Sequence, residues 1–211
     1  FIRGIRKNLS RYPDTVLIGE VWEDASNKIS YGKRRDYILG HSLHGVMNYP
    51  FREMIIAYLT STRSAQDIAY QMMVLNENYP QDIFYNNLNN LGTHDTERIL
   101  TMVGDEANDL AVGMLFTLPG VPCVYYGDEA GLTGRKDPKN RKYFPWKNIH
   151  APTHTLYQEW IAKRRTEKSL YRGKFVPFYH EDVLGILRYT ESEAFVYMVN
   201  PTEVEVTIDF E

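Results

Sequence analysis

The stretch "TVLIGEVWEDA", residues 15–25, decides the fold class of this chain. An apolar run with β-branched residues stops at Gly19 and places an acid, Glu20, close to Trp22. Residues 15–18 are typical of a short strand buried on both faces, which favours a parallel sheet. A charged side chain directly after such a strand would lie at the carboxyl edge of the sheet, where α/β folds build their sites.

Similar apolar runs recur along the chain and alternate with helical patterns. We predict further strands at 43–47, 88–92 and 121–126, and helices at 1–12, from 51 onward, at 65–79, at 107–118 and around 156–161. This alternation favours a parallel sheet with crossover helices. From residue 174 the pattern changes to closely spaced strands at 175–179, 183–189, 194–199 and 204–210. We therefore predict an α/β domain over 1–170 and the start of an antiparallel β domain over 171–211.

The bulk properties exclude several classes of protein. The chain has 211 residues, of which 43% are hydrophobic, so it can bury a core without disulfides or metals. A net charge of −3 without a basic cluster argues against nucleic acid or a membrane surface as a partner. The lone Cys123 excludes an internal disulfide and fits a cytoplasmic protein. Because the sequence opens on Phe1, we expect a processed or excerpted piece.

Polar residues follow three of the four predicted parallel strands. Glu20 follows the first, His94 and Asp95 follow the third, and Asp128 follows the fourth. Since the carboxyl ends of parallel strands meet at one edge, Glu20 and Asp95 are expected to share a site. Two carboxylates beside an aromatic ring suggest sugar chemistry, in which one acid protonates the leaving oxygen while the other stabilises the positive sugar ring.

Five segments in this order resemble the α-amylase family of glycoside hydrolases: "LIGEVWEDA", "GVMNYPF", "NNLGTHDTERIL", "GVPCVYYGDEAGLTG" and "DPKNRKYFPW". They look most like its neopullulanase, cyclomaltodextrinase and maltogenic amylase branch. The resemblance implies the C-terminal half of a (β/α)₈ TIM barrel, followed by part of an antiparallel β domain. Strands five to eight of that barrel would lie at 16–20, 43–47, 88–95 and 121–126.

The resemblance also implies roles for individual residues. Glu20 matches the general acid/base of these retaining enzymes, Asp95 the carboxylate that stabilises the transition state, and His94 a histidine that binds glucose hydroxyls. Asp137 and Arg141 match positions that bind a glucose further toward the non-reducing end.

Trp22 would line the acceptor side of the site. The alternatives are that Trp22 only packs against its neighbours and that Asp137 and Arg141 form an ordinary surface ion pair. Arg98 either holds the Asp95 loop or faces solvent, and Asp128 is interpreted as a structural anchor of its loop.

The family nucleophile is an aspartate in an arginine-x-aspartate motif at the end of the fourth barrel strand, which the resemblance places before residue 1. We therefore expect the nucleophile to be absent and the isolated chain to be inactive. Four strands of a barrel would also leave two unpaired edges, and pairing with a second copy is the expected remedy.

The parent protein is thus predicted to be a retaining hydrolase of α-1,4-glucans such as cyclomaltodextrins, maltooligosaccharides, starch or pullulan, with transfer to a sugar as a second outcome. The alternative is a non-catalytic glucan-binding or scaffold relative. No cofactor is expected, because the calcium ligands of relatives lie mostly outside this segment. The pairs His41/His44 and His150/His154 have metal-like spacing but no evident third ligand, so no metal site is predicted.

Overall fold

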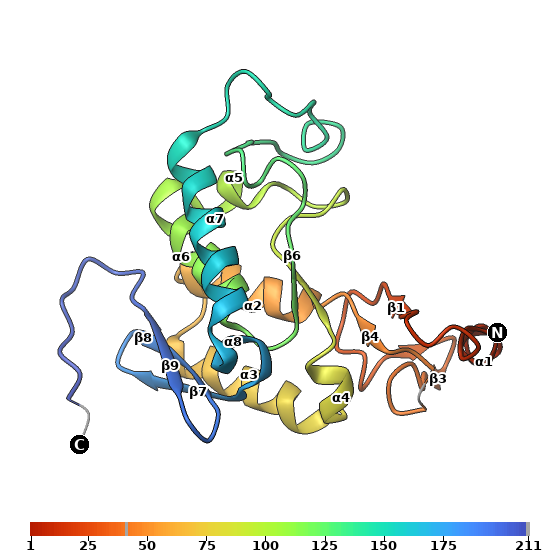
Figure 1. The fold of residues 1–211 in the computed structure, drawn as a ribbon. Helices are drawn as coiled ribbons and strands as arrows, with labels where there is room; N and C mark the ends of the chain where they lie inside the picture. Colours follow the sequence, from red (N-terminus) through yellow and green to blue (C-terminus); the bar gives the residue numbers. More distant parts are fainter. Residues whose placement is uncertain (41, 210–211) are drawn as a thin grey trace.

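A computed structural model describes residues 1–40 and 42–209 (Figure 1). The helices are α1 (Ile2–Leu9), α2 (Tyr49–Leu59), α3 (Ala65–Asn78), α4 (Gln81–Phe84), α5 (Ile99–Val103), α6 (Asp105–Thr117), α7 (Ala151–Thr166) and α8 (Lys168–Arg172). The strands are β1 (Ile18–Gly19), β2 (Ile29–Ser30), β3 (Lys33–Arg34), β4 (Gly45–Val46), β5 (Leu88–Asn90), β6 (Val121–Cys123), β7 (Lys174–His180), β8 (Val183–Tyr189) and β9 (Ala194–Val199). The short hairpin β2–β3 and helices α4, α5 and α8 are additions to the elements predicted from the sequence.

The four predicted parallel strands lie side by side in chain order. β1 pairs with β4, and β5 pairs with β6, both in parallel register. A parallel bridge between Met47 and Leu88 joins the two pairs, and the Asn48 N–H donates to the carbonyl of Leu88 at 2.8 Å. The order β1–β4–β5–β6 is that of consecutive strands in a wound α/β fold, so their carboxyl ends share one edge.

Helices follow the strands and supply most of the core. α2 begins after β4, where the Asn48 side chain caps the helix by accepting from the Phe51 N–H at 3.3 Å. α3 begins at the capping residue Ser64 and buries Ile68, Met72 and Leu75. In Figure 1, α6 and α7 lie together beside β6, and their rings Phe116 and Tyr157 meet edge to face.

The outer strands are less buried than the sequence predicts. The run at 15–18 is not buried on both faces, because Val16 is 67% exposed, and Val121 of β6 is 47% exposed. Among the described residues, β1 pairs only with β4 and β6 only with β5. In the described part of the chain, the outer edges of β1 and β6 therefore have no strand paired to them.

The C-terminal sheet is antiparallel, in the order β7–β8–β9. Its inner face packs on α3 and α6, and Phe175, Leu184, Ile186 and Val199 belong to the same hydrophobic cluster as the helices. The Tyr58 hydroxyl of α2 donates to the carbonyl of Asp182 at 2.7 Å and accepts from the Leu184 N–H. One continuous core thus joins the parallel part of the chain to the antiparallel sheet.

The strand predicted at 204–210 does not form over residues 204–209, and Phe210 lies outside the described residues. Val204, Val206 and Ile208 alternate with polar residues, as in a half-buried strand. The segment runs away from β9 (Figure 1), and Val204 is 65% exposed. Without a ladder of backbone hydrogen bonds to a neighbour, alternation alone does not make a strand.

No helix in the described part of the chain combines the length and apolarity needed to span a lipid bilayer.

Candidate active site

Polar side chains gather at the carboxyl edge of the parallel strands. Glu20 follows β1, Tyr49 is the first residue of α2 after β4, and Asp95 lies in the loop after β5. Because β1, β4 and β5 are neighbours in the sheet, residues far apart in the sequence meet there.

Glu20 is exposed and bound to a tyrosine. The Tyr49 hydroxyl donates to Oε1 of Glu20 at 3.3 Å. The ring of Trp22 stacks on the ring of Tyr49, with centroids 4.0 Å apart and planes inclined by 13°. The sequence predicted Trp22 next to the acid, but the structure places the aromatic stack of Trp22 and Tyr49 there, with the phenol touching Glu20.

The environment of Tyr49 connects Glu20 with Asp95. Tyr49 is buried, and burial is the main reason why the pKa of its phenol is raised. A hydrogen bond with Thr93 lowers this pKa, whereas the negative charges of Glu20 and Asp95 raise it. Both carboxylates thus raise the pKa of one hydroxyl group, and both follow the carboxyl ends of neighbouring strands in the parallel order β1–β4–β5.

Asp95 belongs to a chain of charged groups on the rim of the site. His94 Nε2 lies 3.3 Å from one oxygen of Asp95, and Nη2 of Arg141 lies 3.3 Å from the other. Nε of Arg141 also lies 3.2 Å from Oδ1 of Asp137. The Asp95 side chain is 38% exposed and that of Arg141 is 43% exposed. These pairs contribute little to stability, but they bring four predicted site residues together in reach of solvent.

Buried side chains hold the loop that carries His94 and Asp95. The amide of Asn140 donates to the carbonyls of His94 and Thr96, both at 2.8 Å. Nε of Arg52, from α2, donates to the carbonyl of Leu91 at 2.6 Å. The loop is thus fixed from the helix side and from the segment that bears Asp137 and Arg141.

Arg98 anchors the same region from within. Its side chain is 1% exposed and pairs with Asp128 at 2.8 Å, while its Nε donates to the carbonyl of Asn140 at 2.9 Å. Burial raises the pKa of Asp128 to about 6, and the positive charge of Arg98 opposes this rise. Of the two alternatives for Arg98, the structure therefore supports the one in which it holds the loop, and the interpretation of Asp128 as a structural anchor agrees with its contacts.

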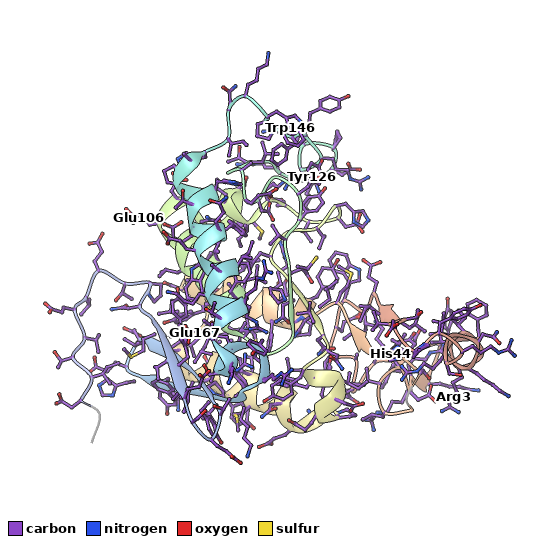
Figure 2. The ribbon with its side chains drawn as sticks, viewed as in Figure 1. Arg3, His44, Glu106, Tyr126, Trp146 and Glu167 are labelled. Atoms are coloured by element: carbon purple, nitrogen blue, oxygen red, sulfur yellow. The ribbon has the colours of Figure 1, made fainter. Side chains whose placement is uncertain are left out.

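The loop after β6 borders the site. Tyr126 lies on this loop and Trp146 further along it (Figure 2), and the Tyr126 hydroxyl donates to the carbonyl of Lys142 at 2.9 Å. A cavity of about 410 Å³ lies next to Asp95, bordered by Arg52, Lys136 and Asp137. Its size is within the range of small-ligand sites.

Two arginine-x-aspartate triplets do occur in the chain, at Arg34-Arg35-Asp36 and Arg135-Lys136-Asp137. Asp36 follows the hairpin strand β3, is exposed and pairs with Arg3 of α1. Asp137 pairs with Arg141 in a loop. Neither aspartate follows a strand of the parallel sheet, so neither has the position that the resemblance implies for a nucleophile.

Two of the histidines with metal-like spacing have other contacts. Nδ1 of His44 accepts from the Leu17 N–H at 2.8 Å, and Nδ1 of His150 lies 2.8 Å from the Thr153 hydroxyl. His41 lies outside the described residues. Within residues 1–40 and 42–209, no three His, Cys, Asp or Glu side chains are arranged to hold a metal ion.

Comparison with known proteins decides the family. The family model "Alpha amylase, catalytic domain" matches residues 1–172. This chain belongs to the α-amylase family. The four parallel strands are accordingly part of a (β/α)₈ barrel, which confirms the fold class predicted from the sequence.

Several relatives within the α-amylase family carry the names of the predicted branch, and others are amylopullulanases. A cyclomaltodextrinase from Geobacillus thermopakistaniensis is 32% identical over 187 residues, which are 86% of this chain and 30% of that protein. Neopullulanase 2 from Thermoactinomyces vulgaris is 32% identical over 202 residues, which are 93% of this chain and 32% of that protein. The chain therefore spans about a third of the length of these curated relatives.

A solved structure has the same fold. Ligand-free cyclic α-maltosyl-(1→6)-maltose hydrolase from Arthrobacter globiformis superposes with a TM-score of 0.86 at 29% identity. The match covers 94% of this chain and 44% of that enzyme. The likeness extends over both the parallel strands and the antiparallel sheet.

Sequence reasoning missed Tyr49, Arg52 and Asn140. Tyr49 lies within "GVMNYPF", where the sequence pattern indicates only the end of a strand before a helix from residue 51, although it follows a barrel strand at the same edge as Glu20 and Asp95. Arg52 and Asn140 are polar residues that are 3% and 0% exposed. No local pattern marks such residues, because their burial depends on loops that are distant in the sequence.

Proposed function

We propose that this α-amylase family chain carries the acid/base part of the active site of a retaining α-1,4-glucan hydrolase. The observation that supports this most directly is the phenol of Tyr49, which binds Glu20 and also lies within the electrostatic reach of Asp95. Retaining hydrolysis of a glycosidic bond needs a carboxylic acid as proton donor and a carboxylate as nucleophile, and the resemblance adds Asp95 as a further carboxylate that stabilises the positive charge.

In this proposal Glu20 is the general acid/base. It is exposed, so it can reach the glycosidic oxygen, and the hydroxyl of Tyr49 fixes its orientation. In the first half of the reaction the nucleophilic aspartate, which the resemblance places outside this chain, forms a bond to the anomeric carbon as the bond to the leaving oxygen breaks, and Glu20 gives its proton to that oxygen. In the second half the acceptor oxygen attacks the anomeric carbon, the bond to the aspartate breaks, and Glu20 takes the proton of the acceptor, which is water in hydrolysis and a sugar hydroxyl in transfer.

Asp95 stabilises the positive charge that develops on the sugar ring, and His94 binds the hydroxyls of the same glucose. Arg141 and Asp137 bind a glucose further toward the non-reducing end, next to the cavity of about 410 Å³. Trp22, which is 45% exposed, lines the acceptor side of the site. The ion pairs that link Asp95, Arg141 and Asp137 support this assignment, because a polar ligand can replace them at little cost.

The substrates proposed are cyclomaltodextrins, maltooligosaccharides, starch and pullulan, in line with the names of the relatives. The test is Glu20→Gln in the full-length protein that the gene encodes, assayed on maltoheptaose. We expect turnover to fall by at least about 10³-fold while maltoheptaose binding is kept, because the variant loses a proton donor but keeps its shape. Glu106→Gln, exposed on α6 (Figure 2), is the matched control.

Unchanged turnover in Glu20→Gln would remove Glu20 from this role. The non-catalytic alternative gives another outcome, in which the full-length wild-type protein binds maltoheptaose without releasing shorter sugars. The 211-residue chain alone is expected to release none.

A second copy of the chain is the proposed protein partner. The exposed Val16 lies just before β1 and the exposed Val121 is the first residue of β6, and open strand edges with apolar residues favour pairing with another strand. Light scattering on the 211-residue chain is expected to give about twice its mass of 24.6 kDa. A stable monomer at micromolar concentration contradicts this part of the proposal.

No resident metal or cofactor is proposed for this chain, so dialysis against EDTA is expected to leave its melting temperature unchanged.

A reducing, cytoplasmic setting is also proposed, since Cys123 is a free thiol.

A further inference from the structure

A groove between α3 and β7 lies outside the candidate active site. Its volume is about 720 Å³, which is larger than the cavity next to Asp95 and within the range of small-ligand sites. Residues of α3 form one side, and residues 177–179 of β7 form the other. No hydrogen bond or ion pair of the candidate active site joins a lining residue of this groove to Glu20, His94 or Asp95.

Phe178 of β7 borders the groove, but its ring lies on the sheet face opposite to Pro177 and Tyr179, because successive side chains of a strand point to opposite faces. Phe178 of β7 pairs with Gly185 of β8 in the antiparallel register. A Cβ atom added to Gly185 would lie only 2.1 Å from the Phe178 ring, so the ring rests directly on the backbone of the neighbouring strand. Gly185 thus leaves space for the ring to lie against the sheet.

Two further aromatic rings stand at the sides. Tyr70 of α3 is 72% exposed, and Tyr179 of β7 is 47% exposed. Two aromatic rings from two elements therefore border one groove, and both expose much of their surface to water. Met73, one turn after Tyr70, also lines the groove.

Polar groups lie in the first turn of α3. Gln66 and Asp67 line the groove and are exposed. The Ser64 hydroxyl donates to Oδ2 of Asp67 at 2.8 Å, which fixes the carboxylate and leaves Oδ1 free of any described hydrogen bond. An amide and a carboxylate beside aromatic rings suit a neutral ligand with hydroxyl groups, whereas the charge of Asp67 disfavours an anion.

A glucose ring has these properties, because its faces are largely apolar C–H surface and its rim carries hydroxyls. Aromatic rings contact the faces, and carboxylate and amide groups accept or donate hydrogen bonds at the rim. We propose that the groove between α3 and β7 is a second binding site for α-1,4-glucan, separate from the site of Glu20 and Asp95. This inference rests on the proposed function, since it assumes the same substrate class.

The test measures binding of maltoheptaose to the 211-residue chain by amide chemical-shift mapping and calorimetry. We expect shifts at residues 66–73 and 177–179. The double variant Tyr70→Ala/Tyr179→Ala is expected to weaken binding at this groove at least about tenfold, since it removes two stacking surfaces. Both side chains are exposed, so the fold is expected to persist. Tyr12→Ala, which removes a tyrosine that is 64% exposed elsewhere, is the control.

Asp95→Asn separates this inference from the proposed function. If shifts at 66–73 and 177–179 persist in Asp95→Asn and vanish in the double tyrosine variant, the second site is supported. Absence of shifts at these residues in the wild-type chain, or binding unaffected by the double variant, overturns it. The role of Glu20 and Asp95 is then still decided separately, by turnover of the full-length protein. Cellohexaose, with β-linkages, is expected to bind at least about tenfold more weakly.

Discussion

The hydroxyl of Tyr49 donates to Glu20 from the first turn of α2, over 3.3 Å, and so links the helix after β4 to the loop after β1. The link depends on the parallel pairing of β1 with β4, which brings the end of one strand next to the end of the other. Trp22 covers the ring of Tyr49 on one face. The position of the proposed acid therefore depends on a side chain that is not itself expected to exchange protons.

Tyr49→Phe tests this link. The ring and its stacking on Trp22 are kept, whereas the hydrogen bonds of the hydroxyl with Glu20 and Thr93 are lost, so we expect the free energy of unfolding to fall by about 1–2 kcal/mol. Turnover of maltoheptaose by the full-length protein is expected to fall roughly tenfold, because Glu20 loses an orienting contact. Tyr12→Phe serves as the control. Wild-type turnover in Tyr49→Phe would show that Glu20 needs no such contact.

The buried pair of Arg98 and Asp128 is expected to be essential for stability. Arg98→Met leaves Asp128 without its cation and removes the hydrogen bond to Asn140, so we expect a loss of about 3–5 kcal/mol in urea unfolding. The double variant Arg98→Met/Asp128→Leu is expected to recover part of this loss, since no charge then stays buried alone. Equal losses in the single and double variants would contradict the importance of charge pairing.

The sequence predicted the order of the parallel strands, the helices that follow them and the common edge of Glu20 and Asp95. These features depend on local patterns: short apolar runs, the capping residue Ser64 before α3, and polar residues directly after strands. The exposure of Val16 and Val121 was not predictable in this way. An apolar run is the same whether or not something covers it, so periodicity does not distinguish the middle of a sheet from its edge.

The candidate site likewise combines features that the sequence predicts with features that it does not. Glu20, His94 and Asp95 follow strands and could be found from the motifs, whereas the stack of Trp22 on Tyr49 depends on how two loops meet. Asn140 and Arg98 are buried because the segment after β6 folds back over the loop after β5. Residues 204–209 had the alternation of a strand but make no ladder, because alternation predicts the sides of a strand and not its partner.

The ionisation of Asp128 gives a prediction about pH. Its pKa of about 6 in the folded protein is higher than the value of about 3.9 expected in the unfolded chain, mainly because of burial. Between roughly pH 4 and 6 the folded state therefore binds more protons at this site, and its contribution to the free energy of unfolding decreases as the pH rises through this range. Above about pH 7 the contribution is constant.

The measurement is urea unfolding of the wild type and of Asp128→Asn from pH 4.5 to 7.5. The difference in the free energy of unfolding, wild type minus variant, is expected to become smaller from pH 4.5 to about 6.5 and then to level off. A difference that grows with pH would instead indicate a lowered pKa, set by Arg98.

Arg188 of β8 is expected to hold the antiparallel sheet to the barrel. It is 0% exposed and donates to the carbonyls of Thr117, at the end of α6, and Gly173, after α8, at 2.8 and 2.9 Å. Arg188→Met leaves buried carbonyls without donors, so we expect a loss of at least about 3 kcal/mol in urea unfolding. Arg188→Lys is expected to recover less than half of this loss, because an ammonium group cannot reach carbonyls on both sides as the planar guanidinium does. Full recovery by lysine would show that only the positive charge near the end of α6 matters, through its interaction with the helix dipole.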